Sequence, residues 1–600
     1  MSKTITLETV FYADLELIFD FNQKLRGNKI KIKILPYIDL IDEEYIVQMI
    51  NHFAFLKKEK NLKLLSFLGV CFNIYALSFE VLYCVLMALE INIFDIFAIL
   101  LLVSWIYNIC ITFFIGFESE KHYIWKLSEL YLILTILSPL FMLLGNFLIS
   151  ASYYQIEISL YSILSYFGFF SLSTCGFIVN YYMLISIQGN KDLKYKKSTT
   201  KSYSKKRSFT CKTFLILGFL YSLSVIDGSS NYAAGVLASA AQVSLGLFFA
   251  FIAFLLFLIK TKPDKIRLIF YSSIGIFTII TCLLPLFAIN SSIIQANIDF
   301  ENAFGSDWDE KIESAQPFFL DSPYSISKYL LGESPKKCEI MKDILYYEGD
   351  GVKLYFDAFI PPSSNLPGNN SVLISIHGGG WSLADKGFTN KIQNNKYFAA
   401  QGYVVFDIQY GLKNSMPFGM ITPENVKGDF TIDDMVRHVG IFTKYLANYS
   451  LDYNANLDSV FITGGSSGGQ LACAVAFAYH HPSYSSLFSQ ALTIKGIIPL
   501  YPANGIATSI LDISGSEDLV QPELLVNQSS PPCLVIHGSS DGIVNPSISL
   551  TLKNKYLHYN NTKIVRILLP FAGHVLDYYF TGVYNQACLY YMERFLYLFR

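Results

Sequence analysis

Ser466 lies in a segment whose residue types suit nucleophilic attack on a carbonyl group. Residues 464–469 read Gly-Gly-Ser-Ser-Gly-Gly, which places Ser466 at the centre of a G-x-S-x-G pattern. A β-branched run precedes this segment and a helical pattern follows it. In that context, glycines permit a sharp strand-to-helix turn that exposes the serine hydroxyl. Taken alone, the pentapeptide fits an ordinary tight connection equally well.

A second segment, residues 376–381, reads Ile-His-Gly-Gly-Gly-Trp and follows another strand pattern. Attack on an acyl carbon places negative charge on its oxygen, and glycines allow backbone N–H groups to approach that oxygen. The segment is therefore expected to form an oxyanion hole. His377, at the start of the loop, is expected to brace it by hydrogen bonding rather than to act as a general base.

Asp541 and His574 complete a Ser, acid, His order along the chain, the order that strand–turn–helix serine hydrolases use. Each follows the end of a strand pattern. We expect His574 to take the proton from Ser466 and return it to the leaving group, and Asp541 to fix the imidazole tautomer. His537 is the main rival base, but it precedes Asp541. Asp577 is a weaker rival for the acid, because it follows His574.

The four segments lie within an alternation of strands and helices in the second half of the chain. Strands are expected at 353–360, 371–376, 403–408, 459–463, 495–500, 533–537 and 563–569. Helices are expected at 389–400, 431–447, 467–480, 547–557 and 581–598. This alternation predicts a doubly wound, mostly parallel sheet. Active sites of such sheets lie beyond the carboxyl ends of the strands, where all four segments fall.

The first half of the chain is far more apolar. Hydrophobic residues make up 52% of the 600 residues and are concentrated there. Seven runs are long enough to cross about 30 Å of hydrocarbon as helices. They lie at 65–89, 91–117, 130–150, 160–187, 213–230, 232–259 and 268–289. The fifth run is the weakest, because Asp227 ends its apolar core, and a re-entrant or interfacial segment is the alternative interpretation.

Clusters of lysine and arginine predict the orientation of these spans. They lie at 57–63, before the first span, at 191–212, between the fourth and fifth, and at 260–267, between the sixth and seventh. Because such clusters stay cytoplasmic, seven spans place the N-terminus in the cytoplasm and the second half on the lumenal or extracellular side. The Asn-x-Ser/Thr sites support a glycoprotein, since all lie at or beyond position 290. They are Asn290, Asn369, Asn448, Asn527 and Asn560.

Residues 340–600 resemble the HGGG-bearing branch of the α/β-hydrolase superfamily, the hormone-sensitive-lipase-like carboxylesterases and lipases. The matching segments are 377–381, 402–405, 407–410, 464–469, 537–541 and 573–574. The resemblance implies Ser466 as nucleophile, Asp541 as acid and His574 as base. It also implies that the backbone N–H groups of Gly379, Gly380 and Ser467 form the oxyanion hole, and that no metal or cofactor is required.

Two positions depart from the pattern of that family. Ser467 stands where a small alanine commonly follows the nucleophile, which keeps the backbone donor but changes the polarity of the pocket. The stretch Asp407-Ile-Gln-Tyr410 stands where the family has Asp-Tyr-Arg. We therefore expect differences in the loop packing below the site and in the substrate.

The sequence predicts a multi-span α-helical membrane region followed by an α/β-hydrolase domain. Its parts are a cytoplasmic N-terminal segment over 1–64, a transmembrane helical region over 65–289, a linker over 290–339 and the hydrolase domain over 340–600. The expected function is hydrolysis of carboxylic esters, with lipid or other hydrophobic acyl esters as substrates, at a bilayer. An amidase or formamidase with the same triad, or a catalytically silent binding or receptor module, are the alternatives.

Composition excludes several other classes of protein. The net charge of −2 gives no basic field for a nucleic-acid partner. The ten cysteines form no C-x-x-C pairs, so neither a zinc site nor a disulfide framework is expected.

Overall fold

The computed structural model describes residues 59–88, 95–116, 122–153, 160–189, 205–261, 264–388, 390–414 and 422–600. The chain divides into two compact units, residues 1–64 and residues 65–600. The second unit contains most of the apolar helices and the whole of the sheet. Most of the predicted N-terminal segment, and most of the basic run at 191–212, lie outside the described residues.

The described residues include seven helical stretches that are long and apolar enough to cross a membrane, the number that the sequence predicts. They are α3 (Glu59–Ala88), α4 (Asp95–Phe114), α5 (His122–Ser150), α6 (Leu160–Gly189), α7 (Lys205–Asp227), a broken stretch from α8 (Tyr232–Ala238) through η4 (Ser239–Val243) to α9 (Ser244–Lys260), and α10 (Lys265–Phe304). Residues 290–304, which we expected to be part of a linker, continue α10 without a break.

The apolar helices of the second unit bury polar side chains and expose apolar ones. Asn73 and Asn180 each donate an amide hydrogen bond of 2.9 Å to the Oδ1 of Asn108, in the interior between α3, α4 and α6. Large side chains on the outside are exposed, such as Phe270 at 56% and Phe287 at 72%. Polar side chains inside and apolar side chains outside are typical of helices that pack in a lipid environment.

Short helices lie where the fifth stretch ends and the sixth begins. Helix α7 ends at Asp227, the residue that ends the predicted apolar core, and η3 (Gly228–Ser230) follows it. The side chain of Asn231 then caps α8 by accepting a 2.9 Å hydrogen bond from the backbone N–H of Ala234. The short helices α8 and η4 lead directly into the fully apolar α9.

The second half of the chain forms an eight-stranded sheet in the order β1-β2-β4-β3-β7-β8-β9-β10. The strands are β1 (Glu339–Gly349), β2 (Val352–Ile360), β3 (Ser371–Ile376), β4 (Val404–Ile408), β7 (Asn456–Gly465), β8 (Ile494–Leu500), β9 (Cys533–Gly538) and β10 (Ile564–Leu569). Strands β3, β4, β7, β8, β9 and β10 are parallel, and β1 and β2 add an antiparallel edge. The sequence predicts all of these strands except β1.

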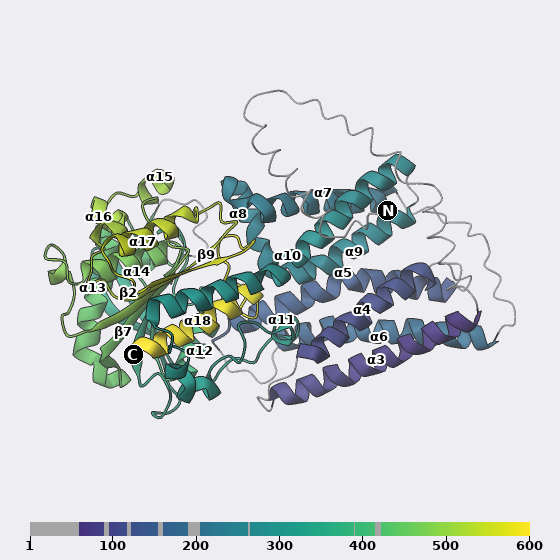
Figure 1. Cartoon of the computed structure of the whole chain (residues 1–600), viewed down its shortest axis with the longest axis horizontal. Coiled ribbons are helices and arrows are strands. Elements are labelled where there is room, and N and C mark those ends of the chain that lie inside the picture. The colour runs from purple at the N-terminus through teal and green to yellow at the C-terminus, as the bar shows by residue number, and fades with distance from the viewer. Residues whose placement is uncertain are drawn as a thin grey trace, which may run out of the picture. The chain divides into compact units, whose positions relative to one another are not determined.

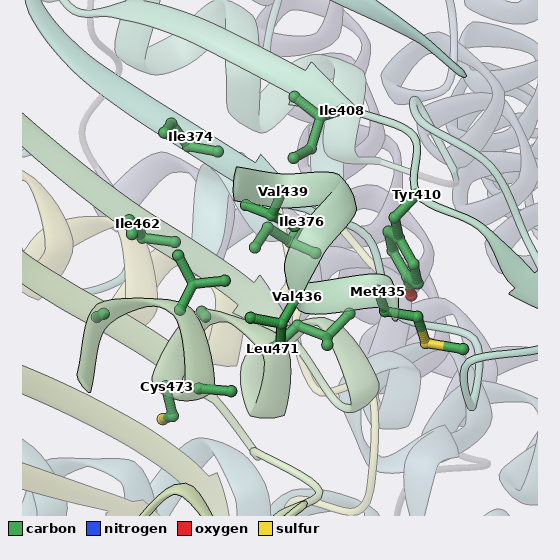
Figure 2. Packing of buried hydrophobic residues seen from close by; sticks show 14 of the residues in the cluster. Ile374, Ile376, Ile408, Tyr410, Met435, Val436, Val439, Ile462, Leu471 and Cys473 are labelled. Carbon is green, nitrogen blue, oxygen red and sulfur yellow. The ribbon is translucent and has the colours of Figure 1, made fainter. Parts of the chain in front are cut away.

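Helices cover both faces of the sheet (Figure 1). Helices α12 (Lys391–Ala400) and α18 (Val583–Phe599) lie on one face, and α13 (Ile432–Tyr449), α14 (Ser467–Ala478) and α17 (Ser547–His558) lie on the other. Every residue of β3 is buried, as expected for a central strand covered on both sides. Figure 2 shows Ile374 and Ile376 of β3 packed with Val436 and Val439 of α13 and Leu471 of α14.

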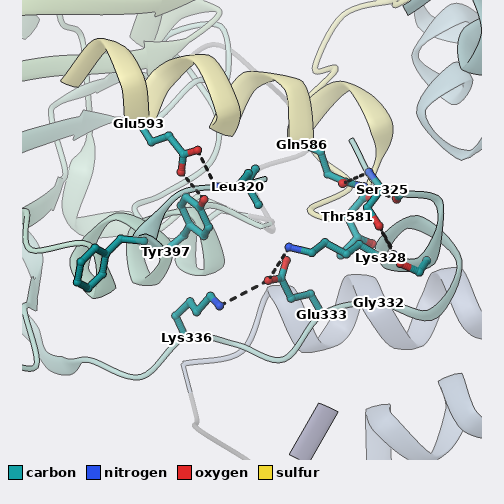
Figure 3. A network of polar contacts seen from close by, with 12 residues as sticks. Leu320, Ser325, Lys328, Gly332, Glu333, Lys336, Tyr397, Thr581, Gln586 and Glu593 are labelled. Carbon is teal, nitrogen blue, oxygen red and sulfur yellow. Dashed lines mark hydrogen bonds and ion pairs between the residues drawn. The ribbon is translucent and has the colours of Figure 1, made fainter. Parts of the chain in front are cut away.

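Helix α10 and the segment after it join the apolar helices to the half that contains the sheet. Ser292 of α10 donates a 2.7 Å hydrogen bond to Leu568 O of β10, the edge strand. In the following segment, Leu320 N donates a 2.8 Å bond to the buried Glu593 of α18, and Ser325 N donates a 2.7 Å bond to Gln586 (Figure 3). These contacts, one buried and two partly buried, join the apolar helices to the half that contains the sheet.

Candidate active site

Ser466 sits at a sharp turn between β7 and α14. Its φ and ψ are 57° and −123°, a left-handed backbone that is strained for a residue with a side chain. Glycines make the turn possible, because a Cβ on Gly468 would lie 2.2 Å from the backbone O of Ile376, and one on Gly464 would lie 2.4 Å from Gly468 O. The serine is partly exposed, whereas Ser467 behind it is fully buried.

His574 lies between Ser466 and Asp541 and contacts both. Its Nε2 is 3.0 Å from Ser466 Oγ, and its Nδ1 is 2.7 Å from Asp541 Oδ2. The three residues come from the ends of β7, β9 and β10, far apart in the sequence. Parallel strands bring them together, because their carboxyl ends meet at one edge of the sheet.

Asp541 is fully buried and held by several donors. Its Oδ1 accepts hydrogen bonds of 3.0 Å and 2.9 Å from the backbone N–H groups of Ile543 and Val544. Burial alone would raise the pKa of Asp541, but the neighbouring His574 and the hydrogen bond from His537 hold it well below its ordinary value. Asp541 is therefore ionised at neutral pH and can orient the imidazole of His574.

The two rival residues occupy other positions. The Nε2 of His537 is 3.3 Å from Asp541 Oδ2 and 2.9 Å from Val544 O, so this ring supports the acid loop. Asp577 pairs with Lys391 at 2.5 Å and accepts a hydrogen bond from the hydroxyl of Tyr501. Among the residues that the structure describes, the carboxylate hydrogen-bonded to His574 is Asp541.

The glycine loop after β3 lies beside the serine turn. A Cβ on Gly378 would lie 2.7 Å from Gly465 O, so only a glycine at this position lets the loop lie this close to the turn. Gly379 and Gly380 have φ values of 126° and 59°. Ser467 is the first residue of α14, where backbone N–H groups have no partner within the helix. The three predicted oxyanion donors therefore belong to two adjacent backbone segments.

Several side chains brace this loop and the neighbouring base. Trp381 Nε1 donates a 2.9 Å hydrogen bond to Gln470 on α14, and Tyr410 OH donates a 3.0 Å bond to His377 O. The His377 ring stacks on Tyr410 with ring centres 4.6 Å apart, and burial lowers its pKa. The ring of Tyr501 packs edge-on, 4.8 Å from that of His574. Only His377 was singled out from sequence as a brace.

The unusual stretch Asp407–Tyr410 packs under the same loop. Asp407 is buried and accepts a 2.8 Å hydrogen bond from Gly387 N, and its burial raises its pKa to about 7. Gln409, which replaces an arginine of the family pattern, donates a 2.7 Å hydrogen bond to Asp385. These contacts hold the end of the glycine loop.

The described residues contain no cluster of His, Cys, Asp and Glu side chains that could hold a metal ion. Ser466, His574 and Asp541 lie in hydrogen-bond contact, next to backbone N–H donors. This arrangement suits nucleophilic acyl transfer.

Comparison with known protein families gives a match within the second half of the chain. Residues 356–509 match the BD-FAE family model. Together with the serine turn and the parallel sheet, this match decides the assignment of the fold. The second half of the chain has the α/β-hydrolase fold.

Over 264 residues, the chain is 24% identical to the probable carboxylic ester hydrolase LipM of Mycobacterium tuberculosis. The match covers 39% of this chain and 56% of LipM, so the chain matches about half the length of that relative. Among solved structures, esterase 2 of Thermogutta terrifontis phosphorylated by paraoxon is 18% identical with a TM-score of 0.34, and covers 43% of this chain and 90% of its own. The butyrate-bound form of that esterase is 16% identical, with a TM-score of 0.35 and the same coverage.

Proposed function

We propose that the protein is a membrane-embedded serine hydrolase that cleaves carboxylic esters through Ser466, His574 and Asp541. One observation carries the proposal: Ser466 Oγ, the two ring nitrogens of His574 and Asp541 Oδ2 form a continuous chain with spacings of 3.0 Å and 2.7 Å. That chain begins at a serine held in a strained left-handed turn. The match to a carboxylic ester hydrolase supports the same activity.

In the first half of the reaction, His574 Nε2 accepts the proton of Ser466 as Oγ attacks the ester carbonyl. The ionised Asp541 keeps the proton of the free imidazole on Nδ1 and stabilises the imidazolium that forms. The negative charge on the carbonyl oxygen is taken up by backbone N–H groups, which we assign to Gly379, Gly380 and Ser467. His574 then returns the proton to the alcohol, which leaves an acyl-serine.

In the second half, a water molecule replaces the alcohol. His574 removes a proton from this water, which attacks the acyl carbon, and the same backbone donors stabilise the second oxyanion. Collapse of the intermediate releases the carboxylic acid and returns the proton to Ser466 Oγ. The partial exposure of Ser466 is compatible with access for both ester and water.

We propose that the seven apolar helices cross a bilayer and that the ester is hydrophobic. The exposed phenylalanines and the buried asparagines of these helices support a lipid environment. An enzyme held at a bilayer meets the hydrophobic esters that partition there at high local concentration. The basic clusters support a hydrolase on the lumenal or extracellular side. The exposure of all five Asn-x-Ser/Thr asparagines is compatible with glycosylation there.

Hydrolysis of p-nitrophenyl esters of increasing chain length by the full-length protein in nanodiscs tests this function. We expect activity that is lost in Ser466→Ala and a preference for longer acyl chains. A folded protein with no ester hydrolysis would favour a silent binding module. Hydrolysis of matched anilides in preference to esters would favour an amidase.

A further inference from the structure

The residues on either side of Asp541 and directly before His574 touch a segment from the apolar half of the chain. This segment, residues 225–243, comprises the end of α7, η3, α8 and η4, and we call it the clamp segment. It comprises the end of the fifth and the start of the sixth of the stretches that are apolar enough to cross a membrane. The hydrolase domain supplies all three residues of the candidate triad, so this contact joins the two halves of the chain at the catalytic loops.

The clamp segment contacts both neighbours of the acid. Ser540 Oγ donates a 2.7 Å hydrogen bond to the carbonyl of Val225. A Cβ on Gly228 would lie 2.2 Å from Ser540 O, and a Cβ on Gly235 would lie 2.5 Å from Gly542 N. Backbone therefore meets backbone before and after Asp541, with no room for a side chain at either glycine.

The same segment also contacts the loop of the base. A Cβ on Gly573, the residue before His574, would lie 2.4 Å from the backbone N of Ser239. Beyond the histidine, the backbone N–H of Tyr579 donates a 2.8 Å hydrogen bond to Gln242 Oε1. One short stretch of chain thus spans both loops.

These loops need such support more than the nucleophile does. Ser466 is fixed by the strand before it and the helix after it, whereas Asp541 and His574 lie on irregular loops after β9 and β10. The loops do bond to each other, since Ser540 N donates a 2.9 Å hydrogen bond to Ala572 O. Irregular loops open at low free-energy cost, and a displacement of about 1 Å at reacting groups reduces rates by about 100-fold.

We propose that the clamp segment is a positioning element of the active site, which holds the Asp541 and His574 loops at their working separation. The proposal rests on the proposed serine hydrolase function. It makes part of the membrane region necessary for the chemistry itself, beyond anchoring the enzyme. Gly235 and Ser540 are the positioning residues that carry the contact.

Substitution of Gly235 in the full-length protein tests the clamp. In Gly235→Ala, the new methyl group would lie about 1 Å closer to the Gly542 backbone than ordinary van der Waals contact allows. The loop that carries Asp541 must therefore move. We expect kcat for a p-nitrophenyl ester to fall by about 100-fold, with KM within about twofold, because the ester-binding surface is unchanged. The control is Gly246→Ala on α9, where the only close contact of the new Cβ, at 2.6 Å, is with the side-chain end of Leu143, and Pro139 lies at an ordinary 3.6 Å. It should retain the wild-type kcat.

If Gly235→Ala does not fold, Ser540→Ala tests the clamp instead, because this substitution removes only one hydroxyl. The loss of one hydrogen bond predicts a decrease in kcat of about fivefold with unchanged KM. A kcat in Gly235→Ala and Ser540→Ala equal to that of Gly246→Ala would overturn the clamp. Wild-type hydrolysis that persists in Ser466→Ala would instead overturn the proposed function, and the clamp with it.

Discussion

Replacement of Asp541 by asparagine tests the assignment of the acid through the tautomer of His574. The two oxygens of Asp541 have different partners: Oδ1 accepts two backbone N–H groups, and Oδ2 faces His574 Nδ1 at 2.7 Å. An asparagine would keep its carbonyl oxygen toward the two N–H donors. Its NH₂ group would then face His574 Nδ1.

This arrangement forces the wrong tautomer on the base. An NH₂ group can only donate, so His574 Nδ1 must become an acceptor and the ring proton must move to Nε2. Nε2 is the atom 3.0 Å from Ser466 Oγ, and once protonated it cannot accept the serine proton. The expected loss in kcat is on the order of 10⁴-fold, or about 5.5 kcal/mol of transition-state stabilisation, with the fold intact.

The assay is kcat and KM for a soluble p-nitrophenyl ester, with thermal unfolding measured on the same samples. Asp577→Asn is the matched control, because this buried carboxylate pairs with Lys391 and Tyr501. It should reduce kcat far less than Asp541→Asn does. If Asp541→Asn stays within about tenfold of wild type, or if Asp577→Asn loses as much activity, the tautomer argument is wrong.

Three further predictions address the turn, the buried acid below the glycine loop and the membrane orientation. Gly468→Ala should lower the melting temperature and abolish activity, because its Cβ would lie 2.2 Å from the Ile376 carbonyl; a variant as stable and active as wild type would contradict the packing described for the turn. Asp407 has a folded-state pKa of about 7, above its ordinary value of 3.8, so its contribution to stability is full below about pH 4 and is lost as the pH rises through 7. Urea unfolding of Asp407→Asn should show a stability gain over wild type that grows with pH across this window, on the order of 4 kcal/mol at most, and a pH-independent difference would refute it. Glycosylation at exposed Asn448 should give an endoglycosidase-sensitive mobility shift that decreases in Asn448→Gln, whereas a protein without any glycan would argue for a cytoplasmic hydrolase.

Much of the sheet could be predicted from sequence because its strands are buried on both faces. Such strands read as short continuous apolar runs, and β3 was predicted with its observed bounds. β1 was missed, because nearly all residues of this edge strand are exposed or half-buried and it contains Glu339, Lys342 and Asp343. The helical continuation of α10 to Phe304 was also missed, since it packs on the sheet and reads as polar linker.

The candidate triad could be predicted because its residues follow strands and obey a fixed order, but its supports could not. Gln470 and Tyr501 contribute through positions set by the turn and by β8, and nothing in their local sequence marks them. Contacts of the clamp segment depend on how two halves of the chain pack, at separations of about 300 residues. A pattern within either half carries no information on that packing.

The most direct test of the central claim is covalent labelling of the full-length protein with a fluorophosphonate, followed by mass spectrometry of the modified peptide. We expect a single adduct on Ser466, and none in Ser466→Ala. In Asp541→Asn the adduct should form more slowly, because the base cannot accept the serine proton. Folded protein that stays unlabelled, or an adduct on another serine, would contradict it.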